Sequence, residues 1–128
     1  MAKQTAVIED IPAFLKWLDT TPLFKASRRE DLEDATLELL NELIRQNNIT
    51  QEAISYVIFT LTEDLNAEFP AKFARLKLGW KDVAMMCFHE LDVPNSLKMC
   101  LRILIVLNCD ENFSPQFVYL KNAKELRS

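Results

Sequence analysis

One arginine in an otherwise apolar run is the residue of this sequence that most needs a chemical explanation. The run extends from Cys100 to Leu107, and Arg102 is its only charged residue. A buried guanidinium must be paired with an acid or must face a ligand, because burying an unpaired charge is costly. Glu90, which follows the apolar stretch 83–87, is the kind of carboxylate that could form such a pair. Both interpretations of Arg102, a structural ion pair and a ligand-binding group, therefore stay open.

The other reactive side chains have simpler explanations. The three cysteines, Cys87, Cys100 and Cys109, lack CxxC spacing, and the single histidine, His89, stands apart from them. This pattern argues against a disulfide framework and a zinc site, and it indicates a reducing compartment. No sequence feature suggests a lowered thiol pKa, so we expect Cys87 and Cys100 to be core thiols rather than nucleophiles.

Length and composition restrict the class of protein. The chain has 128 residues, of which 49% are hydrophobic and 27% charged, which is typical of one globular domain. The net charge of −4 and the lack of a basic run argue against general nucleic-acid binding. A single glycine excludes the glycine-rich phosphate-binding motifs. No stretch approaches the roughly 20 apolar residues of a membrane helix, and no targeting signal is recognisable, so we expect a cytoplasmic protein.

Hydrophobic periodicity predicts a single α+β domain. A long helix begins at the capping box Ser27–Glu30 and has one apolar face, which requires a sheet or another helix to cover it. A second helix is expected to begin at Pro70 and to run through Leu76, with Gly79 as the residue that terminates it. Segments rich in β-branched and aromatic residues predict the strands. These strands are 55–60, 83–87, 97–107 and 117–120.

The two sides of the strand 97–107 differ in chemistry. Because side chains alternate along a strand, Arg102 shares one face with Cys100 and Leu104. The other face, formed by Leu101, Ile103 and Ile105, is purely apolar and predicts the core side.

The first 26 residues have a different pattern. Apolar residues from Val7 to Leu18 recur at helical spacing, Asp10 and Pro12 can start such a helix, and Pro22 breaks it. We therefore expect a helical segment in this region.

Several motifs, in order and at matching separations, resemble one known family. They are TEDLNAEFPAK (62–72) with Arg75 and Gly79-Trp80, ELDV (90–93), SLK (96–98), CLR (100–102), VYL (118–120), Ala123 and Leu126-Arg127. On these motifs, residues 27–128 resemble the AroH class of monofunctional chorismate mutases, and residues 1–26 form a divergent N-terminal segment.

The resemblance implies a mixed sheet packed on a long helix, in a trimeric pseudo-α/β barrel whose sites lie between subunits. It implies chorismate as substrate, prephenate as product, and no metal or cofactor. The active-site arginine of the family corresponds to Arg102, and the glutamate that contacts the substrate hydroxyl corresponds to Glu90. The resemblance assigns the substrate-lining positions to Phe69, Lys72, Arg75, Cys87 and Tyr119, and the tail residues that close over the site to Leu126 and Arg127.

These residue types suit the reaction that the family performs. The Claisen rearrangement involves no proton transfer and no covalent intermediate, so it needs a held conformer and stabilisation of charge on the ether oxygen. A guanidinium such as that of Arg102 is permanently charged and offers forked donors. The carboxylate of Glu90 can accept a hydrogen bond from the ring hydroxyl.

One feature of the family is missing from this chain. The family opens with an Arg-Gly-Ala-Thr-Thr strand whose arginine binds a substrate carboxylate, whereas residues 18–23 here read LDTTPL. Lys16 or Lys25 is a possible substitute. Three alternatives follow: a weakened or specialised mutase, a non-catalytic protein that binds chorismate-like ligands, and a member of the trimeric imine deaminases of similar shape. The motif spacing from Phe69 to Arg102 favours the mutase.

Overall fold

The structure is a computed structural model that describes residues 4–8 (backbone only), 29–96, 98–110 and 112–120. Over these residues the sheet is four-stranded, in the order β1-β4-β2-β3. β2 pairs in parallel with β3 and antiparallel with β4, and β4 pairs antiparallel with β1. The mixed sheet that the family resemblance implied is thus confirmed for the described residues. The strands are β1 (Gln4–Ile8), β2 (Ile54–Leu61), β3 (Ala84–His89) and β4 (Leu101–Cys109).

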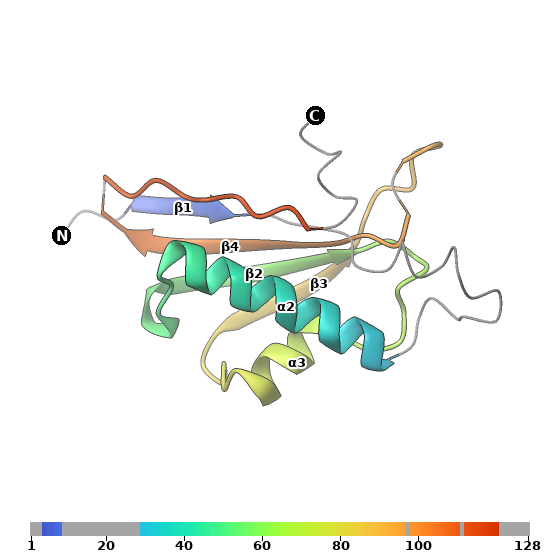
Figure 1. Ribbon diagram of the computed structural model, residues 1–128, viewed down its shortest axis with the longest axis horizontal. Helices are drawn as coiled ribbons and strands as arrows, with labels where there is room; N and C mark the ends of the chain where they lie inside the picture. The colour runs from blue at the N-terminus through green and yellow to red at the C-terminus, as the bar shows by residue number, and fades with distance from the viewer. Residues whose placement is uncertain (1–3, 9–28, 97, 111, 121–128) are drawn as a thin grey trace.

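Two helices cover one face of this sheet (Figure 1). The long helix α2 (Arg29–Asn47) buries the apolar side that its spacing predicted, and Asn48 leaves it with a left-handed φ of 52°. The shorter helix α3 (Pro70–Lys77) has proline at its first position, and Gly79 follows it at φ 71°. A 3₁₀ turn, η1 (Gln51–Ala53), joins α2 to β2. Among the described helices, none is both long and apolar enough to cross a membrane.

The two faces of the sheet have different environments. Against the helices, Val57 and Phe59 of β2 and Ile103 and Ile105 of β4 are completely buried, which confirms the core face predicted for β4. We call the opposite side the outer face, and the described helices leave it open. It carries Tyr56, Ile58 and Thr60 from β2, Met86 and Phe88 from β3, and Arg102 and Leu104 from β4, all half-buried or exposed.

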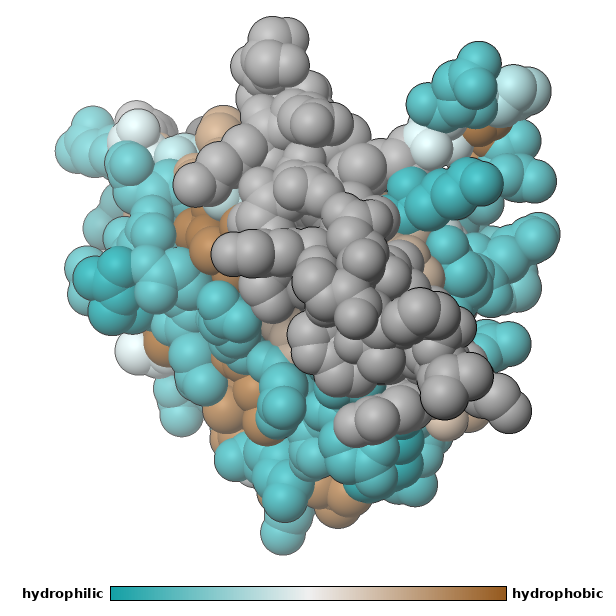
Figure 2. Space-filling view, turned by 45° about the vertical axis from the view of Figure 1, so that its right-hand side comes forward, coloured by the Kyte–Doolittle hydropathy of each residue, from teal (hydrophilic) through white to brown (hydrophobic). Residues whose placement is uncertain are grey.

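Large apolar side chains remain at the surface of the chain. Apolar patches lie between polar side chains on the face of the molecule that Figure 2 shows. On the outer face Tyr56, Met86 and Phe88 are 43%, 58% and 45% exposed. Contiguous exposed apolar side chains on a sheet face are typical of surfaces that another protein covers.

The burial expected for Arg102 was wrong for the single chain. Its side chain retains 38% of its accessible surface, because it points to the outer face rather than to the helices. Paired charges at this level of exposure need no complete desolvation, so the guanidinium fits here without the high cost of a buried charge.

Three predicted segments differ from the structure. The helix expected from Val7 onward was wrong at its start, because residues 4–8 form β1 on the edge of β4; its remainder lies outside the described residues, as does the cap Ser27. The strand expected at 97–107 begins only at Leu101, because Met99 has a left-handed φ of 54°. Residues 117–120 form no strand.

A side-chain amide replaces the missing strand pairing in the C-terminal segment 112–120, which doubles back along the sheet (Figure 1). Asn47, buried at the end of α2, accepts a hydrogen bond from the N–H of Gln116 at 2.7 Å and donates to its carbonyl at 3.0 Å. The amide of Asn47 thus holds the backbone of this segment as a neighbouring strand would. A second donation from Asn47, to the carbonyl of Leu43 at 3.0 Å, fixes the side chain itself.

We predict that Asn47→Ala lowers the free energy of unfolding by about 1–3 kcal/mol, because it leaves part-buried backbone groups of residue 116 unpaired. The exposed neighbour Gln46 offers a matched control, and Gln46→Ala should change stability by less than about 0.5 kcal/mol. Urea unfolding of both variants at equal protein concentration measures the difference. Equal stability of the two variants would show that Asn47 does not anchor the segment.

Candidate functional site

Arg102 and Glu90 meet on the outer face through the pairing of three strands. β2 and β4 place Thr60 directly opposite Arg102, and Glu90 follows the end of β3, where its N–H donates to the carbonyl of Leu61 at 2.9 Å. Nη1 of Arg102 lies 3.5 Å from Oε2 of Glu90. The hydroxyl of Thr60 donates a hydrogen bond to the same oxygen. The two residues singled out from sequence are therefore adjacent, with a threonine beside them that sequence reasoning missed.

This arrangement leaves acceptor capacity on Glu90. Both contacts reach Oε2, and Oε1 accepts no hydrogen bond from any described residue. A fixed guanidinium beside a carboxylate with one oxygen available can bind an anionic ligand that also carries a hydroxyl. The arrangement of Arg102 and Glu90 is therefore suited to recognising an anionic ligand and to stabilising negative charge on it.

The hollow around this pair is small. It has a volume of about 190 Å³ and is lined by Ile58, Thr60, Glu90, Arg102, Ile103 and Leu104. Pockets that enclose small molecules usually measure about 300–1,000 Å³. The hollow that these residues form is therefore smaller than such pockets.

Phe69 and Cys87 line a second, larger hollow of about 450 Å³, between the loop before α3 and the end of β3. Strand register places Cys87 opposite Phe59, on the helix side of the sheet, whereas Arg102 lies opposite Thr60 on the outer face. The structure thus separates two groups of predicted site residues within one chain.

Cys87 has the properties of a structural thiol. Burial raises its pKa above the ordinary thiol value, and a hydrogen bond from the backbone N–H of Ala71 offsets only part of that shift. A raised pKa keeps the sulfur protonated near neutral pH, so it is a poor nucleophile. The direction agrees with the expectation from the sequence.

The predicted basic residues Lys72 and Arg75 lie on α3, whose first residue, Pro70, lines the second hollow. Nζ of Lys72 is 3.0 Å from Oε2 of Glu68, and Nε of Arg29 is 3.6 Å from the same oxygen. The hydrogen bond from Lys72, and then that from the N–H of Phe69, lowers the pKa of Glu68. Arg75 is exposed in the last turn of α3. Glu68 therefore orients Lys72 before any ligand arrives.

The remaining predicted residues belong to the C-terminal part. Tyr119 is partly buried against the hydrophobic core, so a single chain does not bring it fully to the surface. Leu126 and Arg127 lie outside the described residues.

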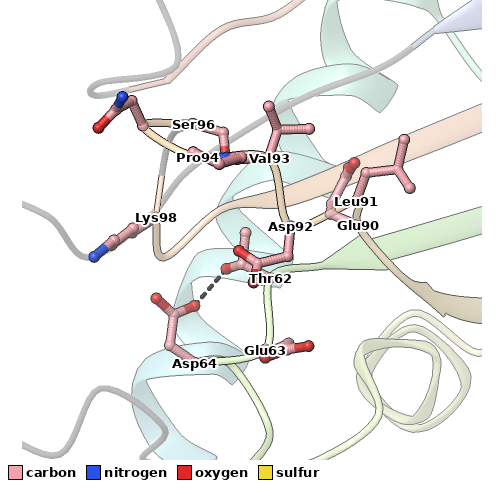
Figure 3. A pocket seen from close by; sticks show the side chains of 11 residues that line it. Thr62, Glu63, Asp64, Glu90, Leu91, Asp92, Val93, Pro94, Ser96 and Lys98 are labelled. Carbon is pink, nitrogen blue, oxygen red and sulfur yellow. Dashed lines mark hydrogen bonds between the residues drawn. The ribbon is translucent and has the colours of Figure 1, made fainter.

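A polar clasp, formed by Thr62 and Asp64, holds the backbone of Met99 and Cys100 just before β4 begins at Leu101. Both carboxylate oxygens of Asp64 accept hydrogen bonds from the N–H of Met99, at 3.0 and 3.2 Å. Thr62 donates to Asp64, as the dashed line in Figure 3 shows, and its hydroxyl accepts from the N–H of Cys100 at 2.9 Å. The clasp satisfies the backbone where Met99 takes its left-handed conformation. The short Thr-x-Asp spacing was its only sequence signal.

Beside the clasp lies an open hollow of about 390 Å³, walled by the loops after β2 and β3. Glu90 lines this hollow as well as the small one around Arg102. Across the described part of the chain, no group of three His, Cys, Asp or Glu side chains is arranged to hold a metal ion.

Comparison with known proteins identifies relatives over most of the chain. The family model described as chorismate mutase type I matches residues 22–128. The chorismate mutase AroH of Bacillus subtilis is 33% identical over 99 residues, covering 77% of this chain and 78% of the relative. The chorismate mutase AroH of Thermus thermophilus is 40% identical over 103 residues, covering 77% and 81%. A solved chorismate mutase from Clostridium thermocellum has a TM-score of 0.77 at 31% identity, covering 95% of this chain and 98% of that one.

We predict that Asp64→Ala destabilises the protein by about 1–3 kcal/mol, because the N–H of Met99 loses a charged acceptor. Amide hydrogen exchange at Met99 and Leu101 should accelerate in parallel. Asp92→Ala is the matched control, since Asp92 is an exposed acid on the same hollow with no partner among the described residues. Unchanged exchange at Met99 in Asp64→Ala would contradict the role of the clasp.

Proposed function

The chain belongs to the type I family of chorismate mutases, and from that premise we propose that Arg102 and Glu90 carry out its conversion of chorismate to prephenate. The activity places it among the isomerases, in the biosynthesis of aromatic amino acids. The two alternatives left open by the sequence, a non-catalytic binder and an imine deaminase, are not favoured, because the named relatives are chorismate mutases.

The reaction makes limited demands on the protein. Within one molecule of chorismate the ether C–O bond breaks as a new C–C bond forms, so the product has the same atoms as the substrate. No proton leaves or arrives, and negative charge grows on the ether oxygen in the transition state. The protein therefore has to select a compact conformer and to place fixed positive charge at that oxygen.

Arg102 and Glu90 meet these demands by their chemistry and placement. The guanidinium of Arg102 keeps its charge at any physiological pH and can donate to the ether oxygen and a carboxylate together. Oε1 of Glu90, without a donor among the described residues, can accept from the ring hydroxyl. The adjacency of these two groups on the open outer face is the observation that supports the proposal most strongly.

We propose that three copies of the chain complete the sites. The Arg102 hollow is too small to enclose the substrate, and the second hollow is a separate one, between the loop before α3 and the end of β3. A neighbouring copy can therefore bring its second hollow against the outer face of the first. The same packing would cover the exposed Tyr56, Met86 and Phe88, and it forms the homotrimeric pseudo-barrel that the resemblance implies.

In this arrangement the remaining predicted residues bind the substrate. Phe69 and Cys87 form an apolar wall, and Lys72 and Arg75 attract the two substrate carboxylates. Tyr119, Leu126 and Arg127 close the site from the C-terminal side. Catalysis by this chain then depends on these cations to compensate for the family arginine that residues 18–23 lack.

The division of the chain at residue 27 and a cytoplasmic location are part of the same proposal. The family match begins at residue 22, close to that boundary. None of the three cysteines forms a disulfide, which suits a reducing compartment.

We predict that Arg102→Ala lowers kcat for chorismate by at least about a hundredfold, because the charge at the ether oxygen disappears. Replacement by citrulline, which keeps the shape without the charge, should have a similar effect, and Arg102→Lys should rescue only partly. The loss of chorismate absorbance in the ultraviolet measures turnover, and thermal unfolding checks that each variant folds. Full activity of the citrulline protein would refute the catalytic assignment. Unfolding of the citrulline protein, with a folded lysine variant, would instead make Arg102 a structural partner of Glu90.

A further inference from the structure

We infer that Thr60 is a positioning residue for the rearrangement, acting through Glu90; this inference rests on the proposed role of Glu90. The hydroxyl of Thr60 donates to Oε2 of Glu90. Its strand position is fixed from both sides, since it pairs with Arg102 on β4 and with Phe88 on β3. Thr60 therefore sits between the strands that bring the acid and the cation together.

The geometry explains why a hydroxyl is needed here. The contact from Arg102 to Oε2 is 3.5 Å long, which is too long for a strong hydrogen bond. Without Thr60, the carboxylate would be free to turn toward the guanidinium and to form a closer pair with it. The hydroxyl holds Oε2 beside Thr60, so that Oε1 keeps its capacity to accept a hydrogen bond from a ligand.

The backbone supports the same orientation. The N–H of Glu90 donates to the carbonyl of Leu61, the residue after Thr60, at 2.9 Å. Main chain and side chain of Glu90 are thus both tied to the end of β2. Because β2 is an internal strand of the sheet, this end is a rigid support, and rigid support of a reacting group is what positioning requires.

The position of the Glu90 carboxylate also affects Arg102. If the carboxylate closed on Arg102, the N–H groups of the guanidinium would donate to Glu90 instead of to the ether oxygen. Thr60 therefore keeps the carboxylate of Glu90 adjacent to the guanidinium without letting it close on Arg102. In holding Glu90 and in keeping it from closing on Arg102, Thr60 does not itself contact the reacting atoms.

The variants Thr60→Val and Thr60→Ser test this inference on the full chain with chorismate. Valine keeps the shape and suits a strand, so the protein should fold with an unchanged unfolding midpoint. We expect kcat/KM to fall by about tenfold or more in Thr60→Val, as for a lost hydrogen bond to a charged group. Thr60→Ser, which keeps the hydroxyl, should stay within about threefold of the parent protein. Ser55→Ala removes a hydroxyl from the exposed end of the same strand and serves as the matched control without effect.

A double-mutant cycle distinguishes an action through Glu90 from any other. In a Glu90→Gln background, which should itself be impaired, Thr60→Val should cause little further loss, because the carboxylate that it positions has been replaced. Multiplicative losses would show that Thr60 acts elsewhere and would overturn the inference. Full activity of Thr60→Val beside an impaired Glu90→Gln would overturn it while leaving the proposed function intact. Full activity of Glu90→Gln would overturn both this inference and the proposed role of Glu90.

Discussion

A positive charge on an open sheet face must be balanced by a neighbouring acid or by a ligand, and in this structure Glu90 provides an acid beside Arg102. Arg102 and Glu90 lie 3.5 Å apart, with side chains 38% and 21% exposed. Ion pairs at this exposure typically add only about 0–1 kcal/mol to stability. The pair is therefore a weak explanation for stability and a good one for binding an anion whose charge shifts during reaction.

The surrounding elements serve to place this pair. The helices α2 and α3 cover only one face of the sheet and so define the outer face on which Arg102 emerges. Asp64 and Thr62 hold the backbone immediately before β4, which sets the register that brings Arg102 opposite Thr60. An error of one residue in that register would turn Arg102 into the core.

Much of this fold could be predicted from local pattern. The apolar spacing of α2, the proline that opens α3 and the alternation along β4 each reflect strong, short-range physics. The adjacency of Glu90 and Arg102 was also within reach, because an isolated arginine in an apolar strand needs an acid.

The sequence predictions were wrong where contacts between distant parts of the chain decide the local structure. β1 exists because its backbone pairs with β4, although its few apolar residues fit a helix equally well. Residues 117–120 have a strand composition, yet the segment is held by the side chain of Asn47 instead of a ladder. Thr60 gave no signal, because a threonine in a strand is ordinary until its partner is known. Nor could alternation along the chain show that Cys87 and Arg102 belong to opposite faces of one sheet.

We propose that a complete site combines the outer face of one copy with the second hollow of another. Mixed assemblies of Arg102→Ala and Arg75→Ala chains, unfolded together and refolded, test this claim most directly, because each inactive chain retains the part that the other lacks. In a ring of three copies, random mixing at equal amounts should restore about a quarter of the parent chorismate turnover, since half of the copies offer each intact part. A mixture no more active than the average of the two separate variants would show that each site lies within one chain, and would contradict the claim.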